Sequence, residues 1–533
     1  MPSLSTADHR PSPPRIHIPR DYNAAHDLIE RNLAAGRAAK TAYIDDAGAY
    51  TYGDLAERVN RCANALMGLG LRPEERVLLC HLDTIDFPAV FLGAIKAGIV
   101  PIAANTLLTT ADYDYMLRDS RARALVVSAP LLPAFAPILA KHSNLSRIIV
   151  SGAVGEEASA PHLSLAVLMA AASPSFAAAE TTCDDACFWL YSSGSTGSPK
   201  GTVHLHSSLV QTAELYAKPV LGIREDDVVF SAAKLFFAYG LGNALTFPLA
   251  VGATAVLMAE RPTPAAVFSR LRKDRPTIFY GVPTLYAALL AYPDAPKREA
   301  LALRRCVSAG EALPAEIGRR WTERFGIDIL DGLGSTEMLH IFLSNRPGEV
   351  RYGTSGTPVP GYDLRIVGDD GNPVARGQVG ELQIKGPTAA MTYWNNRDKT
   401  RDTFQGSWTR SGDKYSLDAD GYYVYSGRSD DMLKVGGIYV SPVEVESALI
   451  THPAVLEAAV IGRADDEKLI KPQAYVVLKA GHQGTPALAD ELRQHVKDRL
   501  APYKYPRWIE FIDELPKTAT GKIQRFKLRA SAS

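Results

Sequence analysis

Hydrophobic and polar residues follow two different periods along the first third of the chain. Apolar residues recur at helical spacing from Thr51 until Gly68 and again between residues 87 and 97, which predicts two helices. Short unbroken apolar runs predict buried strands at residues 76–80, 99–102, 124–128 and 147–151. Because strands alternate with helices at this length, we predict an α/β fold with a parallel, doubly wound sheet.

The same alternation continues in the middle of the chain. Further strands are predicted at residues 228–230, 253–257, 277–280 and 305–308. From residue 353 to residue 385, glycine-rich turns separate short strands. This change of pattern predicts a smaller β-rich subdomain at the end of the large domain.

Charged residues and glycines crowd between Gly427 and Gly437 and indicate a domain boundary. The segment beyond them alternates helix and strand on a smaller scale, which predicts a separate α+β unit. Four prolines stand among the first twenty residues. We therefore predict a loose tail at 1–20, a large N-terminal domain at 21–429 and a small mobile C-terminal domain at 430–533.

Composition excludes several function classes for this chain of 533 residues. A formal net charge of zero disfavours a nucleic-acid partner, which usually leaves a basic footprint. The five cysteines form no Cys-x-x-Cys pair, as expected of a reduced, cytoplasmic protein. An uncharged stretch at 237–259 is long enough to span a bilayer, but its glycines, Asn243 and Pro248 favour a buried core segment. We therefore expect no membrane association, and a monomer or homodimer.

One loop after a predicted strand is suited to phosphate. Residues 191–201 read Tyr-Ser-Ser-Gly-Ser-Thr-Gly-Ser-Pro-Lys-Gly, and a strand at 187–190 precedes them. Open backbone N–H groups, hydroxyls and one lysine can hold phosphate oxygens. The spacing does not fit a Walker loop or a nucleophile elbow, and the alternative is a flexible surface linker. The candidate ligands are Ser192, Ser193, Gly194, Ser195, Thr196, Gly197 and Lys200.

Aromatic residues stand beside glycines at 236–242, in Phe-Phe-Ala-Tyr-Gly-Leu-Gly. Glycine leaves room and an aromatic face offers contact, so this stretch suits a flat slot for a ring. Ordinary core packing explains the composition equally well.

Three further segments carry candidate polar groups. A strand and a glycine-rich turn at 329–334 lead to Glu337, which suits Mg²⁺ beside a phosphate loop, although Ser335 or Thr336 could instead cap a helix. Asp413 ends a Ser-Gly-Asp turn and is a candidate for both ribose hydroxyls, or part of a plain turn. Lys522 lies on a Gly/Thr loop, where the alternative is a solvated basic tail.

Five motifs occur together in one order: the 191–201 loop, Gly-Leu-Gly-Ser-Thr-Glu at 332–337, Ser-Gly-Asp at 411–413, Gly-Arg-Ser-Asp-Asp at 427–431 and Pro-Lys-Thr-Ala-Thr-Gly-Lys at 516–522. This order and spacing resemble the adenylate-forming superfamily, whose members include acyl-CoA synthetases, peptide-synthetase adenylation domains and luciferases. No carrier domain follows Lys522, which favours a free-standing acyl-CoA synthetase.

The resemblance implies a role for each motif, with ATP, Mg²⁺ and coenzyme A as small-molecule ligands. Lys522 would catalyse adenylation, with Thr336 and Glu337 beside it and Glu337 as the metal ligand. Asp413 and Arg428 would bind ribose. Asp430 would be the hinge of a rotating C-terminal domain, and Gly436 and Gly437 would lie along pantetheine. The remaining ATP contacts would be Ser308, Ala309, Gly310, Glu311, Ala312, Asp331, Gly332 and Ser335.

Residues 331–342 resemble benzoate-CoA ligases more than fatty-acyl or acetyl enzymes. The implied acyl residues are Phe236, Ala238, Tyr239, Gly240, Gly332, Leu333, Gly334, His340 and Ile341. An aromatic residue often stands in place of Leu333 in the superfamily, so adenine stacking there is in question. The resemblance implies conversion of benzoate, ATP and CoA to benzoyl-CoA, AMP and diphosphate. Alternatives are a ligase for 4-hydroxybenzoate or 2-aminobenzoate, a short- or medium-chain acyl-CoA synthetase, a luciferase-type oxidative enzyme and an inactive nucleotide-binding scaffold.

Overall fold

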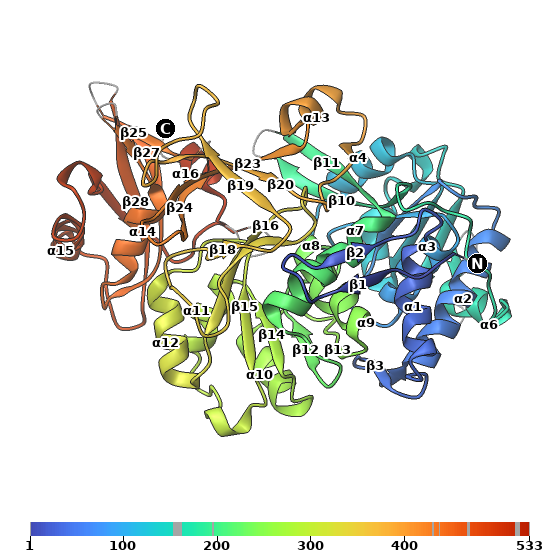
Figure 1. Ribbon diagram of the computed structural model, residues 1–533. Coiled ribbons are helices and arrows are strands. Elements are labelled where there is room, and N and C mark those ends of the chain that lie inside the picture. The colour runs from blue at the N-terminus through green and yellow to red at the C-terminus, as the bar shows by residue number, and fades with distance from the viewer. Residues whose placement is uncertain are drawn as a thin grey trace.

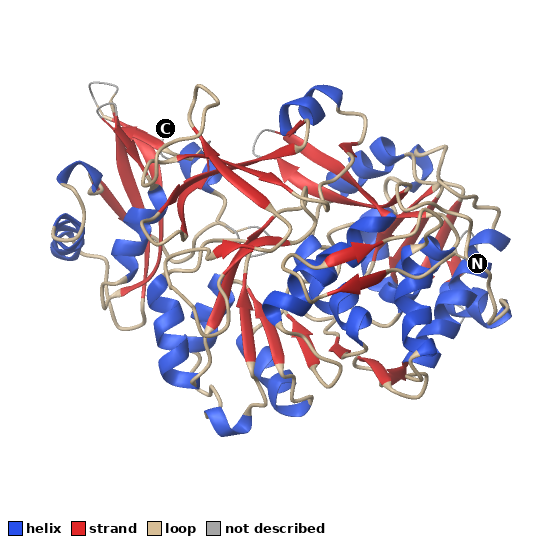
Figure 2. Ribbon diagram, in the orientation of Figure 1, coloured by secondary structure: helices blue, strands red, loops and turns tan. Residues whose placement is uncertain are grey.

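The computed structural model describes residues 2–152, 162–194, 197–428, 431–435, 438–465, 469–517 and 523–531. Two large sheets form the N-terminal domain, and the C-terminal domain lies at the far end of the molecule from the N-terminus (Figure 1). Helices cover the sheets of the large domain and alternate with their strands (Figure 2). This mixed α/β architecture, with a large and a small domain, confirms the predicted fold class.

The first sheet has eight strands in the order β21-β11-β10-β6-β5-β7-β8-β9. Strands β5 to β10 pair in parallel with their neighbours, whereas β11 and β21 run antiparallel at one edge. Predicted strands at 76–80, 124–128 and 147–151 are confirmed residue by residue. Its strands are β5 (Arg76–Cys80), β6 (Val100–Ala103), β7 (Ala124–Ser128), β8 (Arg147–Ser151), β9 (Leu163–Ser164), β10 (Ala186–Gly194), β11 (Gly197–Leu205) and β21 (Thr392–Tyr393).

Helices pack on both faces of this sheet. Thr51 caps α2 by accepting from the Asp54 N–H, and the Asp54 carboxylate completes the capping box. Helix α3 packs closely on α2, because a Cβ on Gly93 would lie 2.6 Å from the Cys62 Cβ. The helices are α1 (Ala24–Ala34), α2 (Tyr52–Gly68), α3 (Asp86–Lys96), α4 (Thr110–Ser120), α5 (Leu132–Phe135) and α6 (Leu165–Ala171), with 3₁₀ turns η1 (Ala129–Leu131) and η2 (Leu139–Lys141).

The second sheet has nine strands in the order β18-β17-β16-β15-β14-β12-β13-β3-β4. Its central strands are parallel. At one end β17 is antiparallel to both β16 and β18, and at the other end β4 is antiparallel to β3. Its strands are β3 (Thr41–Ile44), β4 (Ala49–Thr51), β12 (Val228–Ser231), β13 (Thr254–Val256), β14 (Ile278–Gly281), β15 (Arg305–Ser308), β16 (Ile329–Gly334), β17 (Ile341–Ser344) and β18 (Thr357–Pro358).

One hydrophobic core joins the two large sheets, and a second lies under the outer helices of the nine-stranded sheet. Trp321 and Tyr286 meet edge to face in the second core, with ring centroids 4.8 Å apart. The central helices are α7 (His206–Thr212), α8 (Ala238–Leu241), α9 (Phe247–Val251) and the π-helices η4 (Ala213–Leu221) and η5 (Gly242–Thr246). The outer ones are α10 (Pro264–Lys273), α11 (Pro283–Ala291) and α12 (Ala315–Phe325), with the 3₁₀ turn η6 (Arg298–Ala300).

The predicted β-rich subdomain is an antiparallel sheet of five strands. It contains β19 (Asp363–Val367), β20 (Gly380–Lys385), β22 (Phe404–Gln405), β23 (Trp408–Leu417) and β24 (Tyr423–Arg428), with helix α13 (Arg397–Thr403) beside it.

The C-terminal domain packs helices on a three-stranded sheet, as the alternation after residue 437 predicted. Its elements are the hairpin β25 (Leu433–Val435) and β26 (Ile438–Val440), strands β27 (Val455–Ala464), β28 (Ile470–Leu478) and β29 (Trp508–Phe511), helices α14 (Pro442–Ile450), α15 (Pro486–Lys497) and α16 (Arg525–Ser531), and the 3₁₀ turn η7 (Pro502–Lys504).

The first twenty residues differ from the predicted loose tail. Strands β1 (Thr6–Asp8) and β2 (Arg15–His17) form a hairpin that contacts the large domain. Ser5 Oγ donates to the buried Asp27 carboxylate at 2.6 Å, and His9 Nε2 lies 2.6 Å from Glu214 Oε2. Buried carboxylates require partners, and this segment supplies two of them. The prolines therefore do not prevent an ordered structure.

Residues 237–259 form α8, η5, α9 and β13 within the core. In the described part of the chain, every helix is too short or too polar to cross a bilayer.

Candidate active site

The predicted phosphate loop is a β-hairpin rather than an irregular loop after a short strand. Strand β10 continues through the glycine and serine residues to Gly194, and β11 returns from Gly197. Ser192 lies opposite Lys200, and a bulge separates this pair from Gly194 and Gly197. Antiparallel pairing satisfies the backbone here, which composition alone does not reveal. Ser195 and Thr196 lie outside the described residues.

A polar cluster connects this hairpin to the turn after β16. Glu337 Oε1 accepts from Ser192 Oγ at 3.3 Å and from the Tyr393 hydroxyl at 2.6 Å. Lys200 Nζ lies 4.6 Å from the centroid of the Tyr393 ring. Burial lowers the pKa of Lys200, and the Glu337 carboxylate opposes this shift. The structure therefore brings the predicted lysine and carboxylate together at the base of the hairpin.

Glu337 fits the predicted role of a single carboxylate that contacts Mg²⁺ on a nucleotide. Mg²⁺ binds through one or two carboxylates plus substrate phosphates rather than through an all-protein cage. Among the described residues, no group of three or more His, Cys, Asp or Glu side chains could hold a metal ion. A lone carboxylate beside a phosphate-binding hairpin is consistent with that arrangement.

The turn at 335–338 does not start a helix. Ser335 Oγ accepts from the Met338 N–H at 3.2 Å, and β17 follows within three residues. The Thr336 carbonyl accepts from His204 Nε2 at 2.8 Å. Burial lowers the pKa of His204 to about 4, so the ring is neutral at pH 7. Thr336 is thus held by β11, whereas the partners of Glu337 lie on β10 and β21.

The predicted adenine segment leaves the carboxyl end of β15, where ligands of open α/β sheets bind. Gly310 has φ +94, a conformation that glycine adopts without strain. Asp331 lies on the adjacent strand, and burial raises the pKa of its carboxyl group well above the usual range. The segment comprises Ser308, Ala309, Gly310, Glu311 and Ala312, and Gly332 follows Asp331 on β16.

The C-terminal domain contacts this adenine segment directly. The Ile523 N–H donates to Glu311 Oε1 at 3.1 Å. Ile523 is the residue that follows Lys522 in the chain. The small domain is therefore docked on the nucleotide side of the large domain in this structure.

The predicted ribose ligands form an ion pair across the β-rich sheet. Asp413 and Arg428 are direct partners in the register of β23 and β24. Arg428 Nη1 donates to Asp413 Oδ1 at 2.9 Å, and this carboxylate raises the pKa of Arg428. The side chain of Asp413 is oriented by this pair.

The predicted acyl residues meet between the two large sheets. Gly334 pairs with Ile341 in the β16–β17 ladder, and a Cβ on Gly332 would lie 3.1 Å from the Ile341 side chain. The Tyr239 hydroxyl donates to the Val307 carbonyl at 3.2 Å. The cluster comprises Phe236, Ala238, Tyr239, Gly240, Gly332, Leu333, Gly334, His340 and Ile341.

His340 is buried in this cluster as a neutral ring. Its Nε2 lies 3.2 Å from both the Tyr239 carbonyl and Asn243 Oδ1, so Nε2 carries the proton and donates. Burial lowers the pKa of His340 to about 3. The ring also meets Phe247 edge to face, with centroids 4.5 Å apart. His340 therefore fixes the Tyr239 backbone without adding charge to the acyl site.

Three contributing residues were not predicted. Asn243 is fully buried beside His340, and a polar residue within an apolar run could have identified it. Tyr393 reaches Glu337 from a distant strand, and no local pattern indicates this. Asp83 Oδ1 and Oδ2 accept from the Leu235 N–H at 3.2 and 3.3 Å, at the start of the acyl segment.

Burial of Asp83 predicts a pH-dependent stability. Desolvation raises the pKa of this carboxyl to about 6, against the opposing effects of Lys234 and the Leu235 N–H. A raised pKa means that the fold favours the protonated acid, so the carboxylate destabilises the fold above pH 6. Asp83→Asn retains an acceptor oxygen. Above pH 6 this substitution should raise the free energy of unfolding by roughly 2–4 kcal/mol, and the thermal midpoint should rise with it.

This gain should be absent below pH 4 and should grow between pH 4 and pH 6, because the unfolded-state pKa lies near 4. Scanning calorimetry from pH 4 to pH 8 measures it. The exposed Asp363, replaced by asparagine, is the control and should give no such trend. If Asp83→Asn and the parent have the same thermal midpoint at pH 8, the pKa of Asp83 is not raised by burial.

Besides Ser195 and Thr196, four further predicted residues lie outside the described part of the chain: Lys522, Asp430, Gly436 and Gly437. Their roles remain predictions from the sequence.

The two-sheet fold, the hairpin that brings Lys200 near Glu337, and the paired Asp413 and Arg428 fit an adenylate-forming enzyme. A model of the family described as AMP-binding enzyme matches residues 30–394, and a model of the AMP-binding enzyme C-terminal domain matches residues 444–522. The chain belongs to the AMP-binding enzyme family.

Similar proteins act on aromatic acids. The chain is 68% identical over 533 residues to a benzoate–CoA ligase of Thauera aromatica, with all of both chains covered. A crystal structure of a benzoate CoA ligase from Burkholderia xenovorans has a TM-score of 0.89 at 59% identity, covering 95% of this chain and 100% of that one. An anthranilate CoA ligase in complex with anthranoyl-AMP has a TM-score of 0.93 at 47% identity, covering 97% and 98%.

Proposed function

We propose that this enzyme converts benzoate, ATP and CoA to benzoyl-CoA, AMP and diphosphate. The observation that carries the proposal is the aromatic acyl cluster beside the Lys200–Glu337 hairpin site, in a chain that matches a benzoate–CoA ligase along its full length. ATP and CoA are substrates, and Mg²⁺ accompanies ATP.

The first step forms an acyl-adenylate. A benzoate oxygen attacks the α-phosphorus of ATP, the new O–P bond forms, and diphosphate leaves with the electrons of the bond that breaks. Charge grows on the phosphate oxygens, and cationic groups stabilise it. We propose that Lys522 stabilises this charge and that the 192–200 hairpin binds the β- and γ-phosphates. Glu337 would hold the ion that comes with ATP, and Asp413 with Arg428 would orient the ribose.

The second step exchanges AMP for a thiol. The thiolate sulfur of CoA attacks the acyl carbon, the C–S bond forms, and AMP leaves with the electrons of the C–O bond that breaks. Lys522 must leave the site before pantetheine enters. We propose rotation about Asp430, after which Gly436 and Gly437 line the channel, because glycine allows close approach of the backbone.

The acyl cluster favours a short planar acid. Phe236 and Tyr239 offer aromatic contact, while glycines stand at positions where even a methyl group would clash. A Cβ on Gly240 would lie 2.0 Å from the Lys234 carbonyl, and one on Gly334 would lie 2.7 Å from the His340 carbonyl. Such tight packing within the acyl segment and between β16 and the residues that lead into β17 opposes a long alkyl chain. Small ring substituents such as a hydroxyl or an amino group are the second candidates, as in the anthranilate CoA ligase.

A panel of acids tests this proposal. We expect kcat/KM for benzoate to exceed that for acetate and decanoate by at least about 10²-fold. Acetate loses apolar contact worth about 25 cal/mol per Å², and decanoate needs volume that the packed acyl cluster does not offer. Discrimination between benzoate and 4-hydroxybenzoate should be only about 10–200-fold. AMP formation with ATP and CoA is the readout. Preference for decanoate or acetate would contradict the aromatic assignment and leave the ligase assignment standing.

We also propose a reducing, cytoplasmic location. The cysteines at 62, 80, 183, 187 and 306 are all free. Burial raises the pKa of the Cys80 thiol to about 12, which makes it unreactive, and structural thiols of this kind persist in reducing compartments.

A further inference from the structure

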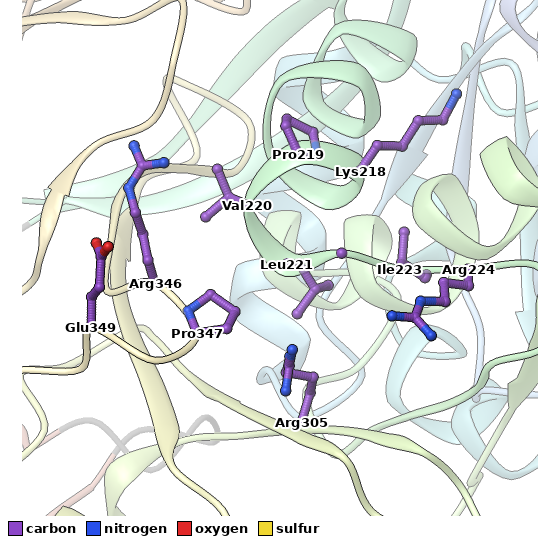
Figure 3. A pocket seen from close by; sticks show the side chains of 11 residues that line it. Lys218, Pro219, Val220, Leu221, Ile223, Arg224, Arg305, Arg346, Pro347 and Glu349 are labelled. Atoms are coloured by element: carbon purple, nitrogen blue, oxygen red, sulfur yellow. The ribbon is translucent and has the colours of Figure 1, made fainter. Parts of the chain in front are cut away.

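A cavity lies at the opposite end of the nine-stranded sheet from the acyl site. It has a volume of about 500 Å³ and lies between the end of η4, the start of β15 and the turn after β17 (Figure 3). Arg305 is the first residue of β15, whereas the adenine segment leaves its last residue, Ser308. We call this space the arginine cavity, after its lining residues Arg224, Arg305 and Arg346.

These three arginines have no carboxylate partner among the described residues. Arg224 is exposed, and its guanidinium makes no hydrogen bond or ion pair there. Arg346 donates to Thr357 Oγ1 at 3.2 Å and to the Pro358 carbonyl at 3.1 Å. Arg305 Nη1 donates to the Arg304 carbonyl at 3.0 Å, while its buried Nε has no partner. Uncompensated cations around one cavity favour an anionic occupant.

The neighbouring Arg304 gives an internal comparison. It forms two hydrogen bonds to the buried Asp227 carboxylate and so is neutralised. Arg305 forms no such pair: burial first, then Arg304 and Arg224, lowers its pKa, and the Asp227 carboxylate opposes this shift. In Figure 3 the guanidinium groups of Arg224 and Arg305 extend toward the middle of the cavity, while Lys218 extends away from it. An anion between them would relieve the repulsion.

Part of the wall of the cavity is apolar. Val220, Leu221, Ile223 and Pro347 line it together with the arginines, and Glu349 is an acidic residue at its edge. Arginine forks match carboxylate and phosphate groups, and apolar walls contact a hydrocarbon body. We propose that the arginine cavity binds a small organic oxyanion, a carboxylate or phosphate on an apolar body, and that its occupancy alters binding of the acid substrate.

The second half of this proposal rests on three elements that run from the cavity to the active site. Helix η4 ends at Leu221 in the cavity, and its Tyr216 ring lies 5.6 Å from the His340 ring. Strand β15 joins Arg305 to Ser308. Strand β17 begins at Ile341 and ends two residues before Arg346. A ligand that shifts any of these elements acts on the acyl or adenine residues through packed structure.

Binding is tested with three probes at constant ionic strength: inorganic phosphate for the head group, benzoate for a carboxylate on a ring, and phenylphosphonate for a dianion on a ring. Calorimetry of the parent protein should show one binding event that is absent from the Arg224→Gln, Arg305→Gln double variant. Each lost charged hydrogen-bond donor should weaken that event about tenfold or more, so loss of both should remove it from the titration. The probe bound most tightly identifies the head group.

The exposed Arg272, replaced by glutamine, is the charge-matched control and should bind like the parent. Arg224→Gln alone alters an exposed side chain, so it keeps the test valid if the double variant does not fold. If the parent and Arg224→Gln bind the probes with equal stoichiometry and affinity, the arginine cavity is not the binding site.

Coupling is tested by the KM for benzoate with and without phosphate. We expect at least a twofold change in the parent and none in the double variant, and the same change in both would overturn the coupling. The binding measurement does not depend on which acid the enzyme activates. Failure of the benzoate assignment would therefore appear in the acid panel and leave the binding result unaffected.

Discussion

Replacement of Glu337 by glutamine is expected to lower the rate of adenylate formation by about 10²–10³-fold. Glutamine keeps the shape and the acceptor oxygen that Ser192 and Tyr393 use, so the hairpin should remain in place. It removes the negative charge of the carboxylate that, in our proposal, binds the Mg²⁺ accompanying ATP. The concentration of Mg²⁺ required for half-maximal rate should therefore rise together with the loss of rate.

Pyrophosphate release measured across a range of Mg²⁺ concentrations tests this prediction. Tyr393→Phe is the matched control, because it removes the 2.6 Å hydrogen bond to Glu337 and leaves the carboxylate intact. Its loss should be smaller, and its Mg²⁺ requirement should stay near that of the parent. An unchanged Mg²⁺ requirement in Glu337→Gln, with a rate within a few-fold of the parent, would rule out the metal role.

Replacement of Lys522 by alanine should separate the two half-reactions. Adenylation should fall by about 10²–10³-fold, because one cationic contact to the developing phosphate charge is lost. Thioester formation from supplied benzoyl-adenylate should continue, because Lys522 has no proposed part in the second step. The contact between Ile523 and Glu311, which docks the adjoining segment on the nucleotide side, supports this assignment.

The two steps are measured separately, as pyrophosphate release and as benzoyl-CoA formation from the adenylate. Lys527→Ala alters an exposed lysine on α16 and should leave both rates unchanged. Equal loss of both half-reactions in Lys522→Ala, or of neither, would remove Lys522 from the adenylation step.

Helices and strands could be predicted from the sequence where the pattern of neighbouring residues is enough to define them. The helix from residue 51 was predicted from apolar spacing, and Thr51 and Asp54 complete its cap within one turn. Strands at 76–80 and 124–128 were predicted to the residue, because buried parallel strands are continuous apolar runs. The candidate phosphate, ribose and acyl residues could be named for the same reason, because each lies in a short motif that can be read locally.

Long-range contacts contradicted or extended other predictions. The prolines near the N-terminus suggested a loose tail, yet the segment forms a hairpin whose His9 reaches Glu214. The glycine and serine loop became paired strands because β11 lies antiparallel to β10. Both outcomes depend on partners distant in sequence, which local composition does not encode.

The sequence by itself determined the alternation of strands and helices, the small C-terminal unit and the motifs that carry the chemistry, because these depend on neighbouring residues. Only the tertiary structure decided which side chains meet. It placed Tyr393 on Glu337, Asp83 on the acyl segment and His340 between Tyr239 and Asn243. It also left three arginines around one cavity without a carboxylate partner among the described residues. Burial sets the pKa values and hydrogen-bond requirements of such groups, and burial arises only when distant segments pack together.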